Sequence, residues 1–182
     1  MTKPQDVLDF WLAPATRERW FDKDADFDAE IRRNFEAAHK EALAGTLDRW
    51  QETADGALAL VILLDQFPRN MYRDSPKAFA ADPKAREVTK AAIARGFDLK
   101  LADQEHRMLF YLPLEHSEDA ADQQRCVELV RERCPDTEFV RYAVDHKEVI
   151  DRFGRFPHRN AILGRPNTPE EEDYLKDPDA GF

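Results

Sequence analysis

The chain has 182 residues, of which 27 are lysine or arginine and 37 are aspartate or glutamate, giving a net charge of -10 at pH 7. This length suits one domain that buries a core without a metal ion or a disulfide. The acidic balance disfavours proteins that bind nucleic acid or anionic membranes through general positive charge. Alanine outnumbers valine and isoleucine together by 24 to 13, which favours helices over strands.

The first half of the chain is predicted to be helical. A short helix over residues 3–12 is followed by a proline-containing break, and residues 24–44 carry apolar side chains at helical spacing on one face. Thr53 opens the next helix, whose residues 58–64 are apolar on every side, as expected of a central buried helix. Pro68 is expected to end this helix.

The second half is also predicted to be helical. Asp82 as N-cap and Pro83 in the first turn predict a helix that Gly96 closes. Three further helices are predicted over residues 102–112, 117–134 and 135–153. A capping box at 168–171 predicts a short terminal helix. Because no run alternates with period two, the predicted fold class is all-α, with 1–182 as a single helical domain.

Nothing in the sequence indicates secretion or a membrane span. The first residues lack an apolar segment of signal-peptide length. The longest apolar run, residues 57–64, is far shorter than the about 20 residues that a bilayer span requires. Cys126 and Cys134 lie roughly 12 Å apart on a predicted helix, too far for a disulfide. We therefore expect reduced thiols and a cytoplasmic protein.

Two segments of the chain echo each other. Residues 64–70 read Leu-Asp-Gln-Phe-Pro-Arg-Asn, and residues 156–160 read Phe-Pro-His-Arg-Asn, with one residue inserted. Each follows a long predicted helix and places an Arg–Asn pair just after a proline. Two occurrences are too few to indicate a solenoid of repeats.

These segments carry a resemblance to a known family. The strings LLDQFPRNMYR (63–73), FYLPLEHSED (110–119) and RFGRFPHRNAILGR (152–165) resemble the bacterial "domain of unknown function 924" family, and Trp20-Phe21 and TPEE at 168–171 also match it. The resemblance covers nearly the whole chain and implies an all-helical, tetratricopeptide-like architecture. Asn167 departs from the pattern, which usually has serine there. The resemblance implies no established activity or catalytic residue, so a site must be argued from the residues.

Arginines gather between residues 150 and 166, where Arg152, Arg155, Arg159 and Arg165 face only one aspartate. Guanidinium groups are planar forks that suit carboxylate and phosphate. The predicted ligand-binding residues are Asp65, Arg69, Asn70, Arg152, Arg155, His158, Arg159 and Asn160. The alternative is that the arginines pair with acidic side chains of the protein itself, since structural ion-pair networks are common.

Asp65 directly follows the buried apolar run. An ionised carboxylate there is costly unless a partner satisfies it, and Arg69, one helical turn later, is the nearest candidate. Two interpretations stay open. The pair is either a structural clamp at the helix end or the floor of a pocket that presents a carboxylate to a cationic or hydroxylated ligand.

The catalytic candidates are Glu115, His116 and His146. In the segment 115–119, Ser117 is predicted to cap the following helix and the two acids after it complement the helix dipole. Glu115 and His116 remain, and they are able to form an acid–base pair. His146 falls on an apolar stripe, so it is either a satisfied core histidine or, if it shares a cavity with His116, a general base.

The motifs exclude several classes of active site but do not identify one function. The sequence has no zinc-protease, calcium-loop, Gly-rich phosphate or nucleophile-elbow motif, so no metal and no cofactor are expected. We predict a binding module whose polar, arginine-lined pocket takes a small anionic ligand or the acidic end of a peptide. The alternative is a small enzyme with a His/Glu acid–base pair acting on an anionic substrate. A third interpretation makes the motif residues structural and assigns function to the outer surface.

The charge, the apolar runs and the tryptophans also indicate which partners to expect. We expect neither a nucleic-acid nor a membrane partner, because the chain is acidic and lacks a span. Trp11, Trp20 and Trp50 are interpreted as core or inter-helix packing residues. Any exposed member of this set would mark a homodimer contact.

Overall fold

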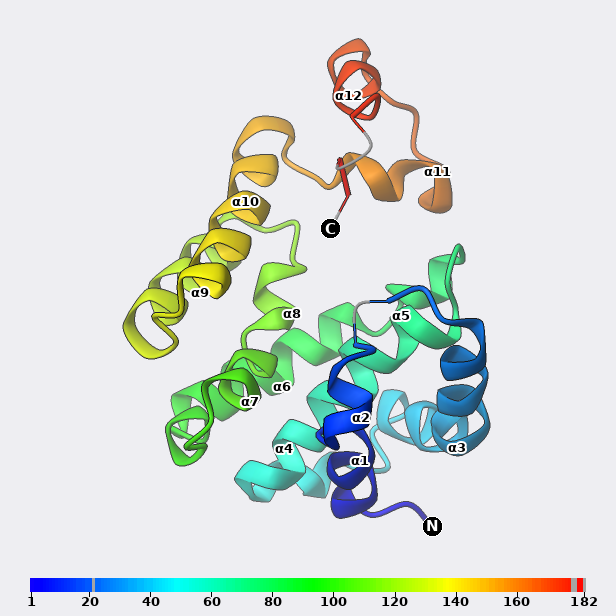
Figure 1. Cartoon of the computed structure of the whole chain (residues 1–182), viewed down its shortest axis with the longest axis vertical. Coiled ribbons are helices and arrows are strands. Elements are labelled where there is room, and N and C mark those ends of the chain that lie inside the picture. The colour runs from blue at the N-terminus through cyan, green and yellow to red at the C-terminus, as the bar shows by residue number, and fades with distance from the viewer. Residues whose placement is uncertain (21, 178–179, 182) are drawn as a thin grey trace.

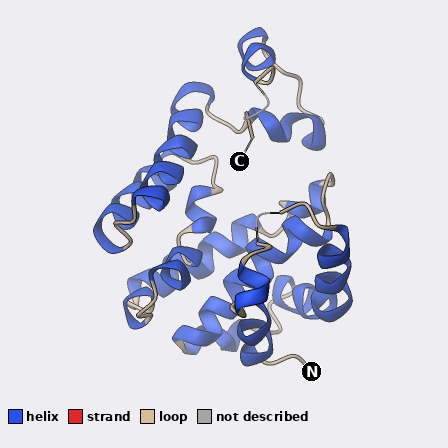
Figure 2. Cartoon of the chain, in the orientation of Figure 1, coloured by secondary structure: helices blue, strands red, loops and turns tan. Residues whose placement is uncertain are grey.

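Helices form all the regular structure in the part of the chain that the structure describes. The computed structural model describes residues 1–20, 22–177 and 180–181. Phe21, the second residue of the Trp-Phe pair, lies outside these ranges. Figure 2 shows helices and loops and no strand over the described ranges, so the all-α prediction is confirmed.

The predicted long helices are all present. The first half contains α1 (Pro4–Trp11), α2 (Pro14–Arg17), α3 (Ala25–Leu43), α4 (Ala54–Val61), α5 (Phe67–Met71) and α6 (Asp82–Ala94). The second half contains α7 (Gln104–Leu109), α8 (Leu112–Glu115), α9 (Ala120–Arg133), α10 (Thr137–Phe153), α11 (Asn160–Leu163) and α12 (Pro169–Tyr174). Single 3-10 turns lie at Asp48–Glu52, Pro76–Ala78, Asp98–Lys100 and Pro157–Arg159. The 3-10 turns and the shortest helices were not predicted, because three to five residues are too few to show a helical period.

The helix predicted over residues 102–112 ends at Leu109, and a separate helix, α8, begins at Leu112. Two N-caps also differ from the predictions. Ala81, not Asp82, is the N-cap of α6, which frees the Asp82 carboxylate to pair with Arg69. Asp119, not Ser117, caps α9 by accepting hydrogen bonds from the backbone N–H groups of the first turn. In both places the side chain predicted to cap the helix is instead bonded to a distant arginine, Arg69 for Asp82 and Arg86 for Ser117, and local sequence does not show such a partner.

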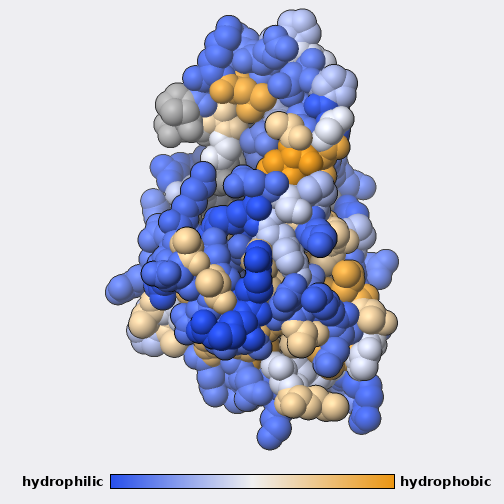
Figure 3. Space-filling view, turned by 90° about the vertical axis from the view of Figure 1, so that its right-hand side faces the viewer, coloured by the Kyte–Doolittle hydropathy of each residue, from blue (hydrophilic) through white to orange (hydrophobic). Residues whose placement is uncertain are grey.

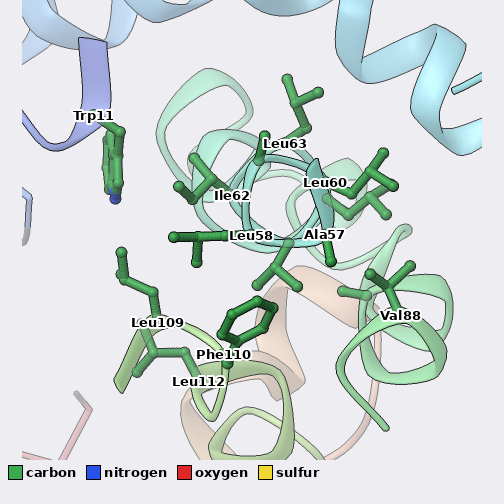
Figure 4. Packing of buried hydrophobic residues seen from close by; sticks show 14 of the residues in the cluster. Trp11, Ala57, Leu58, Leu60, Ile62, Leu63, Val88, Leu109, Phe110 and Leu112 are labelled. Atoms are coloured by element: carbon green, nitrogen blue, oxygen red, sulfur yellow. The ribbon is translucent and has the colours of Figure 1, made fainter. Parts of the chain in front are cut away.

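The core is built around one central helix. Figure 4 shows Leu58, Leu60, Ile62 and Leu63 projecting from it in several directions, and each is at most 1% exposed. Trp11 lies on one side of this helix and Val88 on another in the same view. A helix that is apolar all round must be enclosed by others, and the prediction of a wholly buried central element is confirmed.

The same helix continues past Pro68, contrary to the prediction that this residue ends it. A π-helical turn at Ile62–Gln66 joins α4 to α5, and the Phe67 N–H donates to the Ile62 carbonyl five residues earlier. This wider turn resets the hydrogen-bond pattern, so that Pro68 stands in the first turn of α5. A proline is tolerated there because its missing N–H has no helical acceptor to lose.

The tryptophans pack inside the fold. Trp11 and Trp20 are buried and stack with ring centroids 5.5 Å apart, and the Trp20 Nε1–H donates to the Trp11 carbonyl. Trp50 is partly buried against the core. The tryptophans are therefore packing residues, as interpreted from the sequence, and the homodimer stays a prediction.

A smaller apolar cluster holds the C-terminal segment. It consists of Val149, Ile150 and Phe156, with Phe153 and Tyr174 packed against it. Figure 1 shows α11 and α12 at one end of the long axis, beyond the end of α10, with α1 to α4 toward the other end. In Figure 3 the visible face is mostly hydrophilic, with apolar patches toward the end where α11 and α12 lie.

The cysteines and the helix lengths also bear on the predictions. Cys126 and Cys134 are both buried and free, as expected of reduced thiols. Among the residues that the structure describes, no helix combines the length and apolar character needed to cross a membrane.

Candidate functional site

The site begins with Asp65, which the π-helical turn carries into the interior. Its carboxylate is fully buried and lies 2.9 and 3.0 Å from Nδ1 of His116. Gln66 donates to it through Nε2 at 2.5 Å, and Arg69 Nη1 lies 3.2 Å away. Burial alone would raise the pKa of Asp65, but the charge of Arg69 and the interaction with His116 lower that pKa to about 2. Asp65 is therefore ionised at neutral pH.

His116 follows the last residue of α8 and turns its ring toward Asp65. Because an ionised carboxylate only accepts hydrogen bonds, Nδ1 of His116 carries the proton that Asp65 accepts. Burial and the positive charge of Arg69 lower the pKa of His116. The ring is therefore neutral at pH 7, and its Nε2, with no hydrogen bond to any described residue, keeps a free lone pair.

Arg159 comes from the 3-10 turn Pro157–Arg159 and is only 6% exposed. Its guanidinium lies between the rings of Phe79 and Phe156, 4.6 Å from each centroid. Its ion-pair partner is Asp82 at 3.6 Å, and its Nε is buried without a hydrogen bond to any described residue. Burial and the nearby Arg69 lower the pKa of Arg159 to about 10, so the group is still a cation at neutral pH.

Arg69, unlike Arg159, donates hydrogen bonds to neighbouring residues of the protein. It donates to the Asp65 carbonyl at 2.7 Å and makes two hydrogen bonds to Asp82, at 3.0 and 3.2 Å. The structural clamp considered for Asp65 and Arg69 is thus present. The pocket interpretation is compatible with it, because His116 connects the same carboxylate to a cavity.

That cavity measures about 530 Å³ and lies between three parts of the chain. The segment from the 3-10 turn Pro76–Ala78 into α6, the connection between α8 and α9, and the C-terminal segment each contribute to its walls. The polar and aromatic lining residues are Phe79, Asp82, Arg86, His116, Ser117, Glu118, Asp119 and Arg159. His116 and Arg159 therefore both form part of the cavity wall.

Glu115 and His146 form a second buried pair behind His116. His146 donates from Nδ1 to the Tyr142 carbonyl at 2.8 Å, and the same atom lies 3.6 Å from Glu115 Oε1. Burial, with Asp65 nearby, raises the pKa of Glu115 to about 8, and burial, with His116 nearby, lowers the pKa of His146 to about 3. At neutral pH this contact joins two neutral groups, so it is no ion pair.

The prediction that Glu115 and His116 form an acid–base pair is therefore wrong, because the partner of His116 is Asp65. Neighbouring residues at the end of α8 point in different directions, so that His116 meets Asp65 while Glu115 faces His146 and Cys126. The His116 and His146 rings lie 6.2 Å apart between centroids. His146, in contrast to His116, is not among the residues that line the cavity.

The predicted ligand-binding residues divide into two groups. Asp65, Arg69 and Arg159 are brought together around Asp82, and of these three only Arg159 lines the cavity. His158 lies close by, its ring 5.5 Å from that of Phe156. Burial and the charge of Arg159 lower the pKa of His158 to about 4.

The other group is used within the fold, as the ion-pair alternative foresaw. Arg152 pairs with Glu170, and Arg155 holds Glu171 through two hydrogen bonds. Asn160 donates to Asn167 and Glu171, and Asn70 donates to Asp28 on α3. The expected single surface of all these residues is incorrect, because α12 and α3 supply acids that lie closer to them. Arg165 likewise forms a fork with Glu118.

Sequence reasoning missed Phe79, Asp82 and Arg86 as lining residues. Asp82 was interpreted as a helix cap, and nothing in its local pattern shows that two distant arginines converge on it. The one available signal was the echo between residues 64–70 and 156–160, since Arg69 and Arg159 hold matching places in it and both meet Asp82. In the described ranges, no group of three or more His, Cys, Asp or Glu side chains is placed to hold a metal ion.

Comparison with known proteins agrees with the resemblance seen in the motifs. Residues 7–179 match the family described as "Bacterial protein of unknown function (DUF924)". The chain is 44% identical to a solved Agrobacterium tumefaciens protein of unknown function, ATU0120, with a TM-score of 0.91 over 96% of this chain and 97% of that one. No curated protein matches the chain. The resemblance to the family is therefore confirmed.

Proposed function

The chain belongs to the DUF924 family of bacterial proteins of unknown function, and from this premise we propose a function on the geometry of its own residues. The cavity beside His116 binds a small ligand through a carboxylate or phosphate group, which Arg159 recognises. The free ligand and the acidic end of a peptide present the same chemistry, and the test below separates them.

The observation that supports this proposal is the incomplete pairing of Arg159. A guanidinium carries five N–H donors, yet this buried one has a distant carboxylate at 3.6 Å and two aromatic faces as its partners. Burying a cation with so few hydrogen bonds is costly. A two-oxygen anion in the cavity would supply the bidentate partner that the described residues do not.

The lining suits a small anionic ligand in other respects. A volume of about 530 Å³ falls within the usual range of small-molecule pockets, roughly 300–1,000 Å³. Arg86 adds a second cation to the wall. Three acids also line the cavity. Asp82 and Glu118 are already paired with Arg69 and Arg165 respectively, and Asp119 accepts hydrogen bonds from the first backbone N–H groups of α9. Phe79 offers an apolar surface to the rest of the ligand.

The tetratricopeptide-like arrangement is part of the same proposal. Helices α9 and α10 are joined by three residues and pack along each other, and α3 packs along α5. Stacked helical pairs of this kind leave a concave side on which a ligand can be held.

The proposal is tested by thermal unfolding of the whole protein in inorganic phosphate, succinate, and a short peptide with a free acidic end. At 100 times its dissociation constant a ligand should add about 2.7 kcal/mol of stability, seen as a rise in Tm. We expect Arg159→Gln to abolish the rise and the matched exposed variant Arg152→Gln to keep it. A response to the peptide alone would assign the cavity to peptide ends.

Two results would contradict the proposal. One is an unchanged Tm in all three ligands, and the other is an Arg159→Gln protein that still responds like the wild type. Loss of the fold is a minor concern for this variant, because it removes a buried cation with few partners. Its urea unfolding curve without ligand checks that point.

A further inference from the structure

The Asp65–His116 pair has the geometry of an acid–base device directed into the cavity. We propose that the cavity is a hydrolytic active site, in which His116 acts as general base and then general acid, Asp65 positions it, and Arg159 holds the free carboxylate of an ester substrate. This inference rests on the proposed anion site, because Arg159 is what places the substrate.

The first support is the arrangement of the two ring nitrogens of His116. Asp65 accepts the Nδ1 proton at 2.9 and 3.0 Å, which fixes the tautomer. The other nitrogen, Nε2, has no hydrogen bond to a described residue, and the ring forms part of the cavity wall. The side chain is 16% exposed, so a molecule in the cavity has access to it. A neutral imidazole oriented by a buried carboxylate is the arrangement that general-base catalysis requires.

The second support is the way in which Asp65 itself is held. It lies in a π-helical turn, a feature that is rare within helices and frequent at functional sites. Gln66 and Arg69 hold both the position and the ionised state of the carboxylate. His116 adds a further hydrogen bond to this carboxylate, and unlike Gln66 and Arg69 it also lines the cavity.

Water is the nucleophile that the cavity makes available. Ser117 is the hydroxyl on the wall, but it already donates to Asp122 at 2.9 Å and accepts from Arg86 at 2.8 Å. Its lone pairs and proton are therefore committed. Cys126 is buried behind the site, and burial raises the pKa of its thiol, so it is not a nucleophile at neutral pH.

The reaction balances with water as its one co-reactant. Nε2 of His116 removes a proton from water as the water oxygen bonds to the ester carbonyl carbon, and the carbonyl π electrons move to its oxygen. When this oxyanion collapses, the bond between carbon and the alcohol oxygen breaks. The alcohol oxygen keeps the bonding pair and takes the proton from the imidazolium. An acid and an alcohol leave, and the neutral imidazole is restored.

The charged groups around His116 determine its pH response. Asp65 and Arg69 face it from the central helix, Arg159 and His158 from the C-terminal segment, and His146 from α10. Burial and the two arginines lower the pKa of His116, while Asp65 acts in the opposite direction. In Asp65→Asn that opposing charge is lost. The pKa of His116 then falls further, and the acidic limb of kcat/KM against pH moves to lower pH.

The test uses the full chain with the anionic ester 4-nitrophenyl hydrogen adipate, and the neutral ester 4-nitrophenyl butyrate as the comparison. We expect His116→Gln to lower kcat by on the order of 100-fold or more, with the exposed variant Arg152→Gln unchanged. Asp65→Asn should lower kcat and shift the acidic limb, which a merely structural role would not do. For the wild type, kcat/KM for the anionic ester should be at least tenfold higher than kcat/KM for the neutral ester. Inorganic phosphate should inhibit hydrolysis of the anionic ester competitively.

Three outcomes would overturn the inference: no protein-dependent hydrolysis of the anionic ester, equal rates in wild type and folded His116→Gln, or no preference for the anionic ester. If phosphate still raises the Tm in that case, the binding function stands and catalysis alone fails. If the Tm does not respond either, both proposals fail.

Discussion

Glu115 and His146 lie 3.6 Å apart in the interior, and both are neutral at pH 7. The pKa of Glu115 rises to about 8 and that of His146 falls to about 3, in each case chiefly because burial disfavours the charged form. Neither value requires catalysis, because both groups are buried behind the cavity. Their shifted pKa values instead affect the free energy of unfolding, and they make it depend on pH.

For Glu115 the folded-state pKa of about 8 exceeds the ordinary value of 4.5. The folded state thus binds its proton more tightly than the unfolded chain does. The contribution of the protonated Glu115 to the free energy of unfolding is fully present below pH 4.5. It is lost as the pH rises toward 8, by up to about 1.4 kcal/mol per pH unit. Glu115→Gln keeps the shape of the protonated group and removes this loss.

We therefore expect the free energy of unfolding of Glu115→Gln to exceed that of the wild type increasingly from about pH 5 to about pH 8. Urea unfolding at a series of pH values measures the difference. Asp151→Asn, at an exposed carboxylate, is the matched control and should follow the wild type. Parallel curves for Glu115→Gln and the wild type would show that Glu115 is ionised in the folded protein.

At the residue scale, sequence reasoning selected Asp65, Arg69, His116 and Arg159, which the structure brings together. It paired His116 with its neighbour Glu115, because adjacency is visible in a sequence. The structure instead pairs His116 with Asp65, 51 positions away. Such a pairing depends on how α8 packs beside the central helix, and no local pattern contains it.

Among the elements, the two echoing segments show what a pattern can and cannot predict. In each one a buried phenylalanine and a proline precede the arginine, and the two arginines both pair with Asp82. The pattern predicted that the segments play similar parts. It did not predict that Arg69 donates three hydrogen bonds, two of them to Asp82, whereas Arg159 lies 3.6 Å from the same carboxylate. Asp82 belongs to α6, outside both segments, so no pattern within them shows this difference.

Helix α12 is held in place by arginines that were expected to bind a ligand. Arg155 donates to Glu171 through Nε at 2.7 Å and through Nη2 at 2.8 Å, and to the Pro166 carbonyl at 2.9 Å. Glu171 is also the residue that completes the capping box with Thr168. One guanidinium thus ties the start of α12 to the turn that follows α10.

We expect Arg155→Ala to loosen α12 while leaving the phosphate response intact. Removal of Arg155 leaves the buried Glu171 carboxylate without its cation, and the helix that carries it should open more often. Thermolysin should then cut within residues 164–177 faster than in the wild type. Arg152→Ala, which breaks an exposed pair, should change the cleavage rate little. Loss of the phosphate-induced Tm rise in Arg155→Ala would instead place this arginine in the binding site.

On the scale of the whole molecule, composition and periodicity were sufficient to predict the fold class and the central buried helix. Both depend on the burial of apolar side chains at helical spacing, which the sequence displays directly. The continuation of that helix through Pro68 was not predictable in the same way. It requires a π-helical turn, and only the tertiary contacts of Asp65 show why such a turn is retained there.

The division into a large core and a small C-terminal cluster determines where the molecule should open first. The central helix is enclosed by the large cluster, whereas α11 and α12 depend on Val149, Ile150, Phe156 and a few ion pairs. Segments with few buried apolar contacts open with lower free energy than the core. We therefore expect amide hydrogens of α11 and α12 to exchange faster than those of α4.

The same division links ligand binding to local stability. Arg159 lies in the C-terminal segment, while Arg86 and His116 lie on the other walls of the cavity. An anion that contacts both sides must therefore favour the closed arrangement of the C-terminal segment. Saturating phosphate should slow exchange in α11 and α12 by a larger factor than in α4, and Arg159→Gln should remove this difference. Equal slowing in α4 and α11 would show that the two cores open together, and that the ligand stabilises the molecule as one unit.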